Sequence, residues 1–154
     1  MKIIDLLKED FSQTLEFIDK CDNHIFMIKN WAIITSSGVI AFAISQDHDF
    51  LSLVNLFFLL AFIYLELMYK SFQDTAIEHT DDISKRIDKY LVSPDAEDLL
   101  AGYNHSFGRK LKYPSIRPVL LSILYNKQRR HIINFYSILA FISVAAFVVA
   151  KFVS

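Results

Sequence analysis

The chain has 154 residues, of which 53% are hydrophobic, and it contains 14 Phe but only three Gly and three Pro. So few helix-breaking residues favour long helices over a fold of strands and turns. The single cysteine, Cys21, excludes an internal disulfide and a cysteine-based metal cluster, and we expect it to be a small buried side chain.

The net charge of −1 hides a strong asymmetry along the chain. All 17 acidic residues lie within residues 1–98, whereas residues 99–154 contain eight Lys or Arg and no acid. An acid-free basic segment indicates an anionic partner such as phosphate groups, nucleic acid or lipid headgroups. The alternative is that these cations only flank a membrane helix, which explains Lys127 better than it explains Arg109 or Arg117.

Residues 1–23 are predicted to form an amphipathic cytoplasmic helix. Its acidic charge disfavours anionic lipid headgroups, so we expect it to pack on other helices instead. The apolar face repeats at helical spacing and consists of Ile4, Leu7, Phe11, Leu15 and Ile18.

Three later stretches are predicted to cross a membrane, because spanning the hydrocarbon takes roughly 20 mostly apolar residues. The first two, 24–45 and 50–69, form a transmembrane hairpin, and the third lies within residues 132–154. The turn at 46–49 has no Lys or Arg, whereas Lys70 and the KQRR sequence at 127–130 border the other ends of the spans. By the positive-inside rule the N-terminus and residues 70–131 are cytoplasmic and the C-terminus is outside.

No Gly or Pro occurs between Phe50 and Val92, so the second span is predicted to continue as one helix of about 60 Å. Beyond the membrane it presents a seam with coiled-coil-like spacing. The rest of the 70–131 cytoplasmic domain is predicted to contain a basic, aromatic loop at 102–114 and a further helix after Pro118. The seam consists of Phe72, Ala76, Thr80, Ile83, Ile87 and Tyr90.

Polar side chains follow one face of each predicted span, and polar groups in such helices usually face protein or water. Asn55 and Glu66 share a face of the second span, and Ser37, Gly38, Ala41 and Ser45 give the first span a small-residue face that permits close helix contact. On the last helix one face, expected to point toward protein, carries Lys127, Arg130, Asn134, Ser137 and Phe141.

A three-span bundle has little room to bury these groups, so the sequence predicts an all-α membrane protein that forms a homo-oligomeric bundle, with a tetramer favoured. The candidate pore and gating residues are Asn134, Ser137, Phe141, Glu66 and Asn55, with Glu66 expected to pair with Arg130 or Lys127. The alternative is that Asn134, Ser137 and Asn55 only hydrogen-bond between helices. The candidate ligands for an anionic nucleotide are Arg109, Lys110, Lys112, Arg117, Lys127 and Arg130.

The sequence contains no nucleophile–base set, metal-ligand spacing or phosphate-binding Gly loop, so we expect neither an enzyme nor a cofactor. The five His are scattered, and His48 in the 46–49 turn is a poor metal site without further ligands.

IKNWAI at 28–33 and IYLELMYKSF at 63–72 carry a family resemblance. They resemble the small transmembrane effectors of prokaryotic antiphage defence, of the SLATT-like and CBASS type, in which Lys-Asn-Trp-like residues open the first span and an acidic, Tyr-rich end closes the second. The added basic segment and third span look more like the effectors of the Hailong defence system. The resemblance implies an inner-membrane channel gated by an oligonucleotide or cyclic nucleotide signal, which a nucleotidyltransferase encoded nearby supplies. It also implies depolarisation of the membrane and abortive infection.

Two other functions fit the same residues. A non-conducting membrane scaffold would recruit a cytosolic partner through the 70–92 helix and would tolerate Leu at Asn134 and Ser137. A holin-like toxin would need no ligand at all.

Overall fold

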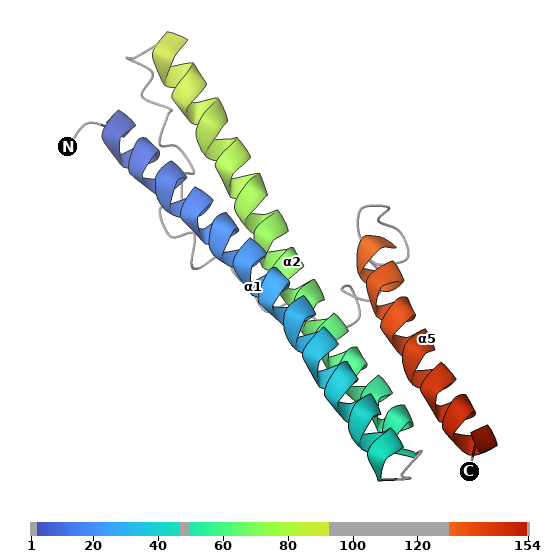
Figure 1. Cartoon of the computed structure of the whole chain (residues 1–154). Helices are drawn as coiled ribbons and strands as arrows, with labels where there is room; N and C mark the ends of the chain where they lie inside the picture. The colour runs from blue at the N-terminus through green and yellow to red at the C-terminus, as the bar shows by residue number, and fades with distance from the viewer. Residues whose placement is uncertain (1–2, 47–49, 93–129, 154) are drawn as a thin grey trace. The chain divides into compact units, whose positions relative to one another are not determined.

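The computed structural model describes residues 3–46, 50–92 and 130–153, and every regular element among them is an α-helix. The helices are α1 (Ile3–Ser45), α2 (Phe50–Val92) and α5 (Arg130–Val153) (Figure 1). The bounds of α2 confirm the long second helix predicted from the absence of Gly and Pro. The predicted N-terminal helix and first span instead form one continuous helix, α1, because no Pro or Gly interrupts them before Gly38.

Two compact units divide these helices. We call residues 24–45, 50–68 and 130–153 the span unit, and residues 3–23 and 69–92 the polar unit. Among the described residues, α1, α2 and α5 are each long and apolar enough to cross a membrane, and a membrane location is compatible with all three.

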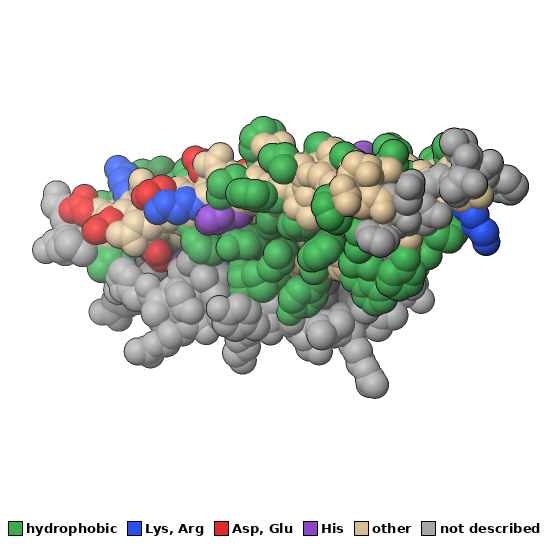
Figure 2. All heavy atoms as spheres, turned by 60° about the horizontal axis from the view of Figure 1, so that its bottom comes forward, with side chains coloured by type: hydrophobic (Ala, Val, Ile, Leu, Met, Phe, Trp, Pro, Cys, Tyr) green, Lys and Arg blue, Asp and Glu red, His purple; other side chains and the backbone are tan. Residues whose placement is uncertain are grey.

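A small apolar core holds the span unit together. Its buried residues come from all three helices, and α2 runs antiparallel to α5, since Glu66 lies near Tyr136 whereas Asn55 lies near Ser143. Most other large apolar side chains of this unit are exposed, and Figure 2 shows a broad hydrophobic surface on the face in view. Such an inverted surface suits lipid better than water. The core residues are Ala32, Leu59, Leu67, Ile132 and Tyr136.

The predicted small-residue face of α1 is not covered by the helices that the structure describes. Ser37, Gly38, Ala41 and Ser45 are exposed, and a Cβ added at Gly38 would meet nothing within 4 Å. The α1 side that is buried carries Ala32, Ser36 and Ala43 instead.

In the polar unit, α1 and α2 bury polar and apolar side chains together. Leu7, Cys21, Ala76 and Ile83 are buried, as sequence periodicity predicts for apolar positions on these faces. The predicted N-terminal face is shifted, however, because Leu15 is 42% exposed whereas Asp10 and Thr14 are buried. The shift is possible because both polar groups have hydrogen-bond partners, which lowers the cost of burying them.

Candidate functional site

The strongest concentration of charge in the span unit is a cluster around Glu66, where one residue from each helix meets. Glu66 of α2 is 1% exposed. Its Oε1 lies 3.1 Å from Nζ of Lys29 on α1, and its Oε2 accepts a hydrogen bond of 3.0 Å from the hydroxyl of Tyr136 on α5. Both carboxylate oxygens therefore have a partner, and we call Lys29, Glu66 and Tyr136 the Glu66 cluster.

Aromatic packing holds the cluster in place. Nζ of Lys29 lies 5.7 Å from the centroid of the Phe135 ring, close enough for a cation–π interaction. Phe135 and Tyr136 are in edge-to-face contact, with ring centroids 5.0 Å apart. The Lys29 side chain is 34% exposed, so its ammonium reaches the surface while its partner is buried. An ion pair of this kind is weak evidence for stability, because the desolvation of the two charges offsets their attraction.

A second polar contact lies nearer the start of α2. Nδ2 of Asn55 donates a 2.8 Å hydrogen bond to Oγ of Ser143 on α5, and Ser143 in turn donates to the carbonyl of Leu139. Asn55 lies 11 residues before Glu66, which is about 16 Å along the helix. Within the part of the chain that the structure describes, Oδ1 of Asn55 and Oγ of Ser36 are buried without a hydrogen-bond partner.

The second span thus confirms the face that its polar residues predicted. Asn55, Leu59 and Glu66 are all buried on it. Among the described residues the cation beside Glu66 is Lys29 and not Arg130, whereas Lys127, the other expected partner, lies outside the described ranges.

The last helix presents its predicted polar face outward. Arg130, Asn134, Ser137 and Phe141, which we call the α5 stripe, are all exposed in the chain, and Phe141 is 74% exposed. Helical geometry places the centre of this stripe about 150° around α5 from the buried face. The expectation that the stripe points toward protein is therefore not met within a single chain. The buried residues of α5 are Ile132, Tyr136 and Ser143.

Most of the candidate nucleotide ligands lie outside the described residues. Arg130 is the one that falls within α5, where it is exposed. The candidate nucleotide ligands outside the described ranges are Arg109, Lys110, Lys112, Arg117 and Lys127.

The seam predicted on α2 is partly confirmed, since Ala76 and Ile83 are buried and Thr80 is half-buried.

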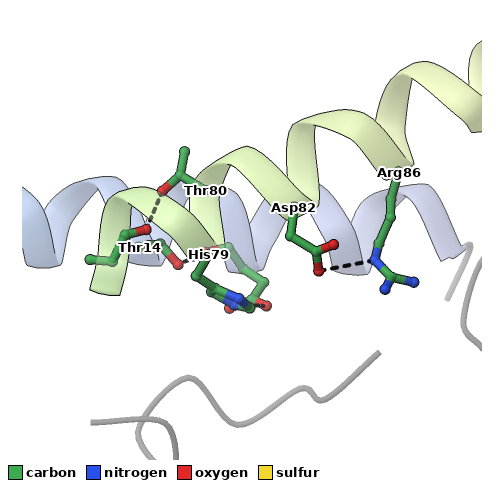
Figure 3. A network of polar contacts seen from close by, with 7 residues as sticks. Thr14, His79, Thr80, Asp82 and Arg86 are labelled. Atoms are coloured by element: carbon green, nitrogen blue, oxygen red, sulfur yellow. Dashed lines mark hydrogen bonds and ion pairs between the residues drawn. The ribbon is translucent and has the colours of Figure 1, made fainter. Parts of the chain in front are cut away.

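The polar unit has a buried network of its own, which the sequence interpretation missed. Nε2 of His79 lies 3.1 Å from Oδ2 of Asp10, and both side chains are at least nine-tenths buried (Figure 3). Oγ1 of Thr14 donates to the Asp10 carbonyl. A separate bond joins Nε2 of Gln73, which is buried, to Oδ1 of Asp22, which is exposed. Groups of three or more His, Cys, Asp or Glu that could hold a metal are absent from the described ranges.

Cys21 is buried in the polar unit, as expected for a small apolar side chain. Burial raises the pKa of its thiol above the ordinary value of 9.0, and the neighbouring charge of Asp22 raises it further, against a smaller opposing effect of Lys70. The thiol is therefore protonated near neutral pH and poorly suited to nucleophilic chemistry.

Over the residues that the structure describes, the fold and the site define a class of protein: a helical chain with three candidate membrane helices and a buried carboxylate, Glu66, that bonds to the other two. No protein-family model, curated protein or solved structure matches the chain.

Proposed function

We propose that the chain is a membrane effector of bacterial antiphage defence. In this proposal it forms a homo-oligomeric ion channel in the inner membrane, which an anionic nucleotide or oligonucleotide signal gates. Opening depolarises the membrane and leads to abortive infection. The N-terminus and residues 70–131 are cytoplasmic and the C-terminus is periplasmic, as the distribution of Lys and Arg favours.

The α5 stripe is the observation that carries this proposal. Asn134 and Ser137 are exposed on a helix whose other exposed side chains are largely apolar, such as Ile138 at 61% and Val149 at 61%. Lipid offers no hydrogen-bond partner to an exposed amide or hydroxyl, so such groups face protein or water. A second copy of α5, or the water of a pore between several copies, meets this need, and Phe141 provides an apolar constriction further along the same face.

In the proposed channel, the Glu66 cluster stabilises one arrangement of the three helices over the other. It ties α1, α2 and α5 together through charged and hydrogen-bonding groups rather than through apolar contact alone. Any movement of α5 that reshapes a pore must break the bond between Tyr136 and Glu66 or carry Glu66 with it. An anion that neutralises the basic residues of the acid-free segment biases the equilibrium by its difference in affinity for the two states.

Reconstitution tests the proposal directly. Purified protein in liposomes loaded with potassium should release the ion when nucleotides are added, and Asn134→Leu and Ser137→Leu should reduce that release strongly. Ile138→Leu, a neutral change at a neighbouring exposed position, is the matched control and should behave as wild type. Release that is equal in all four proteins would contradict the assignment of the α5 stripe to the pore.

Ligand binding needs a separate measurement. Titration with short oligonucleotides at two salt concentrations should show weaker binding at the higher one, because each phosphate neutralised adds to the salt dependence. Arg130→Gln should reduce the salt slope. Absence of binding at both concentrations would remove nucleotide gating from the proposal.

The scaffold function remains the second candidate, and the surface of α2 in the polar unit favours it. Ile77 is 48% exposed on this surface. The exposed side chains near it on α2 are the acids Glu78 and Asp81 and the base Lys85. A scaffold predicts that charge reversal on this surface abolishes function, while Asn134→Leu and Ser137→Leu leave it intact. A holin-like toxin would stay lethal after deletion of its genomic neighbours.

A further inference from the structure

An apolar groove of about 550 Å³ lies between α2 and α5 in the span unit. Its size falls in the range of small-molecule and cofactor sites. Ser137 and the Tyr136 hydroxyl supply the polar side-chain atoms among the lining residues, and the rest of the surface is hydrocarbon. The lining comes from Leu56, Leu59, Leu60 and Ile63 on α2 and from Ile133, Tyr136, Ser137 and Ala140 on α5.

We propose that this groove binds an acyl chain of an anionic phospholipid, whose phosphate lies against Arg130. The proposal rests on membrane insertion of the span unit, as in the proposed function. The groove opens between two helices that are each long and apolar enough to cross a membrane, so the medium at its mouth is lipid. An unfilled apolar hollow loses dispersion contacts on every wall, and an acyl chain restores them.

The position of Arg130 selects the headgroup. Arg130 is exposed and lies seven residues before Ser137, which places it on the same side of α5 and about 10 Å along the helix axis. The groove itself extends from Ile133 to Ala140 on α5, again about 10 Å. A lipid tail lying along the groove therefore brings its headgroup to the Arg130 end, where a guanidinium can hold a phosphate by two parallel hydrogen bonds.

Lipid in the groove also acts on the Glu66 cluster. Tyr136 forms one wall of the groove, and its hydroxyl is the group that donates to Glu66. An acyl chain beside Tyr136 adds dispersion contacts to those that already bury this side chain in the position from which its hydroxyl reaches the carboxylate. Bound lipid thereby stabilises the contact between α5 and α2.

Native mass spectrometry tests the site. The full-length protein is reconstituted in vesicles of equal parts phosphatidylglycerol and phosphatidylcholine and then transferred to detergent. Wild type should retain phosphatidylglycerol in preference to phosphatidylcholine. Leu60→Phe and Ala140→Phe fill the groove from opposite helices and should each lower the retained lipid per protomer, whereas Ile138→Phe, outside the groove, should not.

The substitution Arg130→Gln tests recognition of the headgroup separately from binding of the acyl chain. It should reduce the preference for phosphatidylglycerol about fivefold, the factor that corresponds to roughly 1 kcal/mol for one basic residue near an anionic surface. Total retained lipid should change little, because the groove is intact.

Two results would overturn the proposal. Equal lipid retention by wild type, the two filled variants and the control would show that the groove holds no lipid. Filled variants that lose oligomer but keep their lipid would show that a second copy of the chain occupies the groove. Ion release from liposomes distinguishes the proposals, since a conducting protein without retained lipid refutes the lipid site alone.

Discussion

Replacing Glu66 by Gln gives the sharpest test of the buried cluster. The amide keeps the shape of the side chain and an acceptor for the Tyr136 hydroxyl, but it removes the negative charge 3.1 Å from Nζ of Lys29. Breaking a buried ion pair by removing one partner costs about 3–5 kcal/mol when the remaining charge is fully buried. Lys29 is 34% exposed and can regain part of its hydration, so we expect a loss of about 2 kcal/mol in the free energy of unfolding.

A double-mutant cycle isolates the pair. Glu66→Gln, Lys29→Met and the double variant are compared with wild type by equilibrium unfolding in detergent micelles. We expect a coupling energy of about 1–2 kcal/mol, because the double variant leaves no unpaired charge. The matched control is Asp81 and Lys85, an ion pair on α2 with side chains 73% and 76% exposed, whose coupling should stay below about 0.5 kcal/mol. A Lys29–Glu66 coupling as small as the control would refute the reasoning.

Three further predictions use the same preparations. Tyr136→Phe leaves Oε2 of Glu66 without its donor and should cost about 1–2 kcal/mol of unfolding free energy, whereas Tyr64→Phe should be neutral; equal effects would argue against the bond. Ser143→Ala removes the acceptor of Asn55 and should cost about 0.5–1.5 kcal/mol, with little added by Asn55→Ala in the same chain, and full additivity would contradict the pairing. The reaction rate of the Cys21 thiol with maleimide should keep rising with pH beyond the point where an exposed cysteine reaches its plateau, because burial raises the pKa of the thiol and lowers the fraction of thiolate at each pH. The control is an exposed cysteine, Ser12→Cys, in a chain that also carries Cys21→Ala. Plateaus at the same pH in the two proteins would refute the shift.

The pairing of Lys29 with Glu66 could have been predicted from the sequence. Lys29 is the only charged residue of the stretch 24–45, and Glu66 is the only one between residues 50 and 68. Each lies 18 residues from the turn, Lys29 before Asp47 and Glu66 after His48. In an antiparallel hairpin these positions lie at the same height, and two opposite charges there pair more readily than either can remain alone.

The packing of α5 could not be predicted in the same way. Polar residues occur on two faces of this helix, with Tyr136 and Ser143 on one and Asn134 and Ser137 on the other. Helical periodicity alone does not predict which of the two faces is buried. Complementary groups on α2 decide between them, because Glu66 and Asn55 are placed to bond Tyr136 and Ser143. That information lies in tertiary register, which a single helix does not carry.

The polar unit, built from parts of α1 and α2, illustrates the same limit. Apolar periodicity predicts Leu15 in the buried face and Asp10 outside it, whereas Leu15 is exposed and Asp10 is buried. His79 lies 69 residues further along the chain, so the sequence near Asp10 gives no sign of its partner. A buried acid becomes predictable only once its partner is known, since without one its burial would be too costly.

The two polar faces of α5 have opposite requirements, and this difference favours assembly. Tyr136 and Ser143 are satisfied within the chain, so they add nothing that another copy must supply. Asn134 is exposed on the far side of the same helix and needs hydrogen-bond partners that lipid lacks, whereas Ser137 lies between the two faces, at the edge of the groove. If copies meet through the α5 stripe, Tyr136 and Ser143 hold α5 against α2 within each protomer. The stripe on the other side of α5 then joins the protomer to its neighbours. In the proposed channel, a movement of α5 that changes the contact between copies must therefore break the Tyr136–Glu66 bond or carry Glu66 with it.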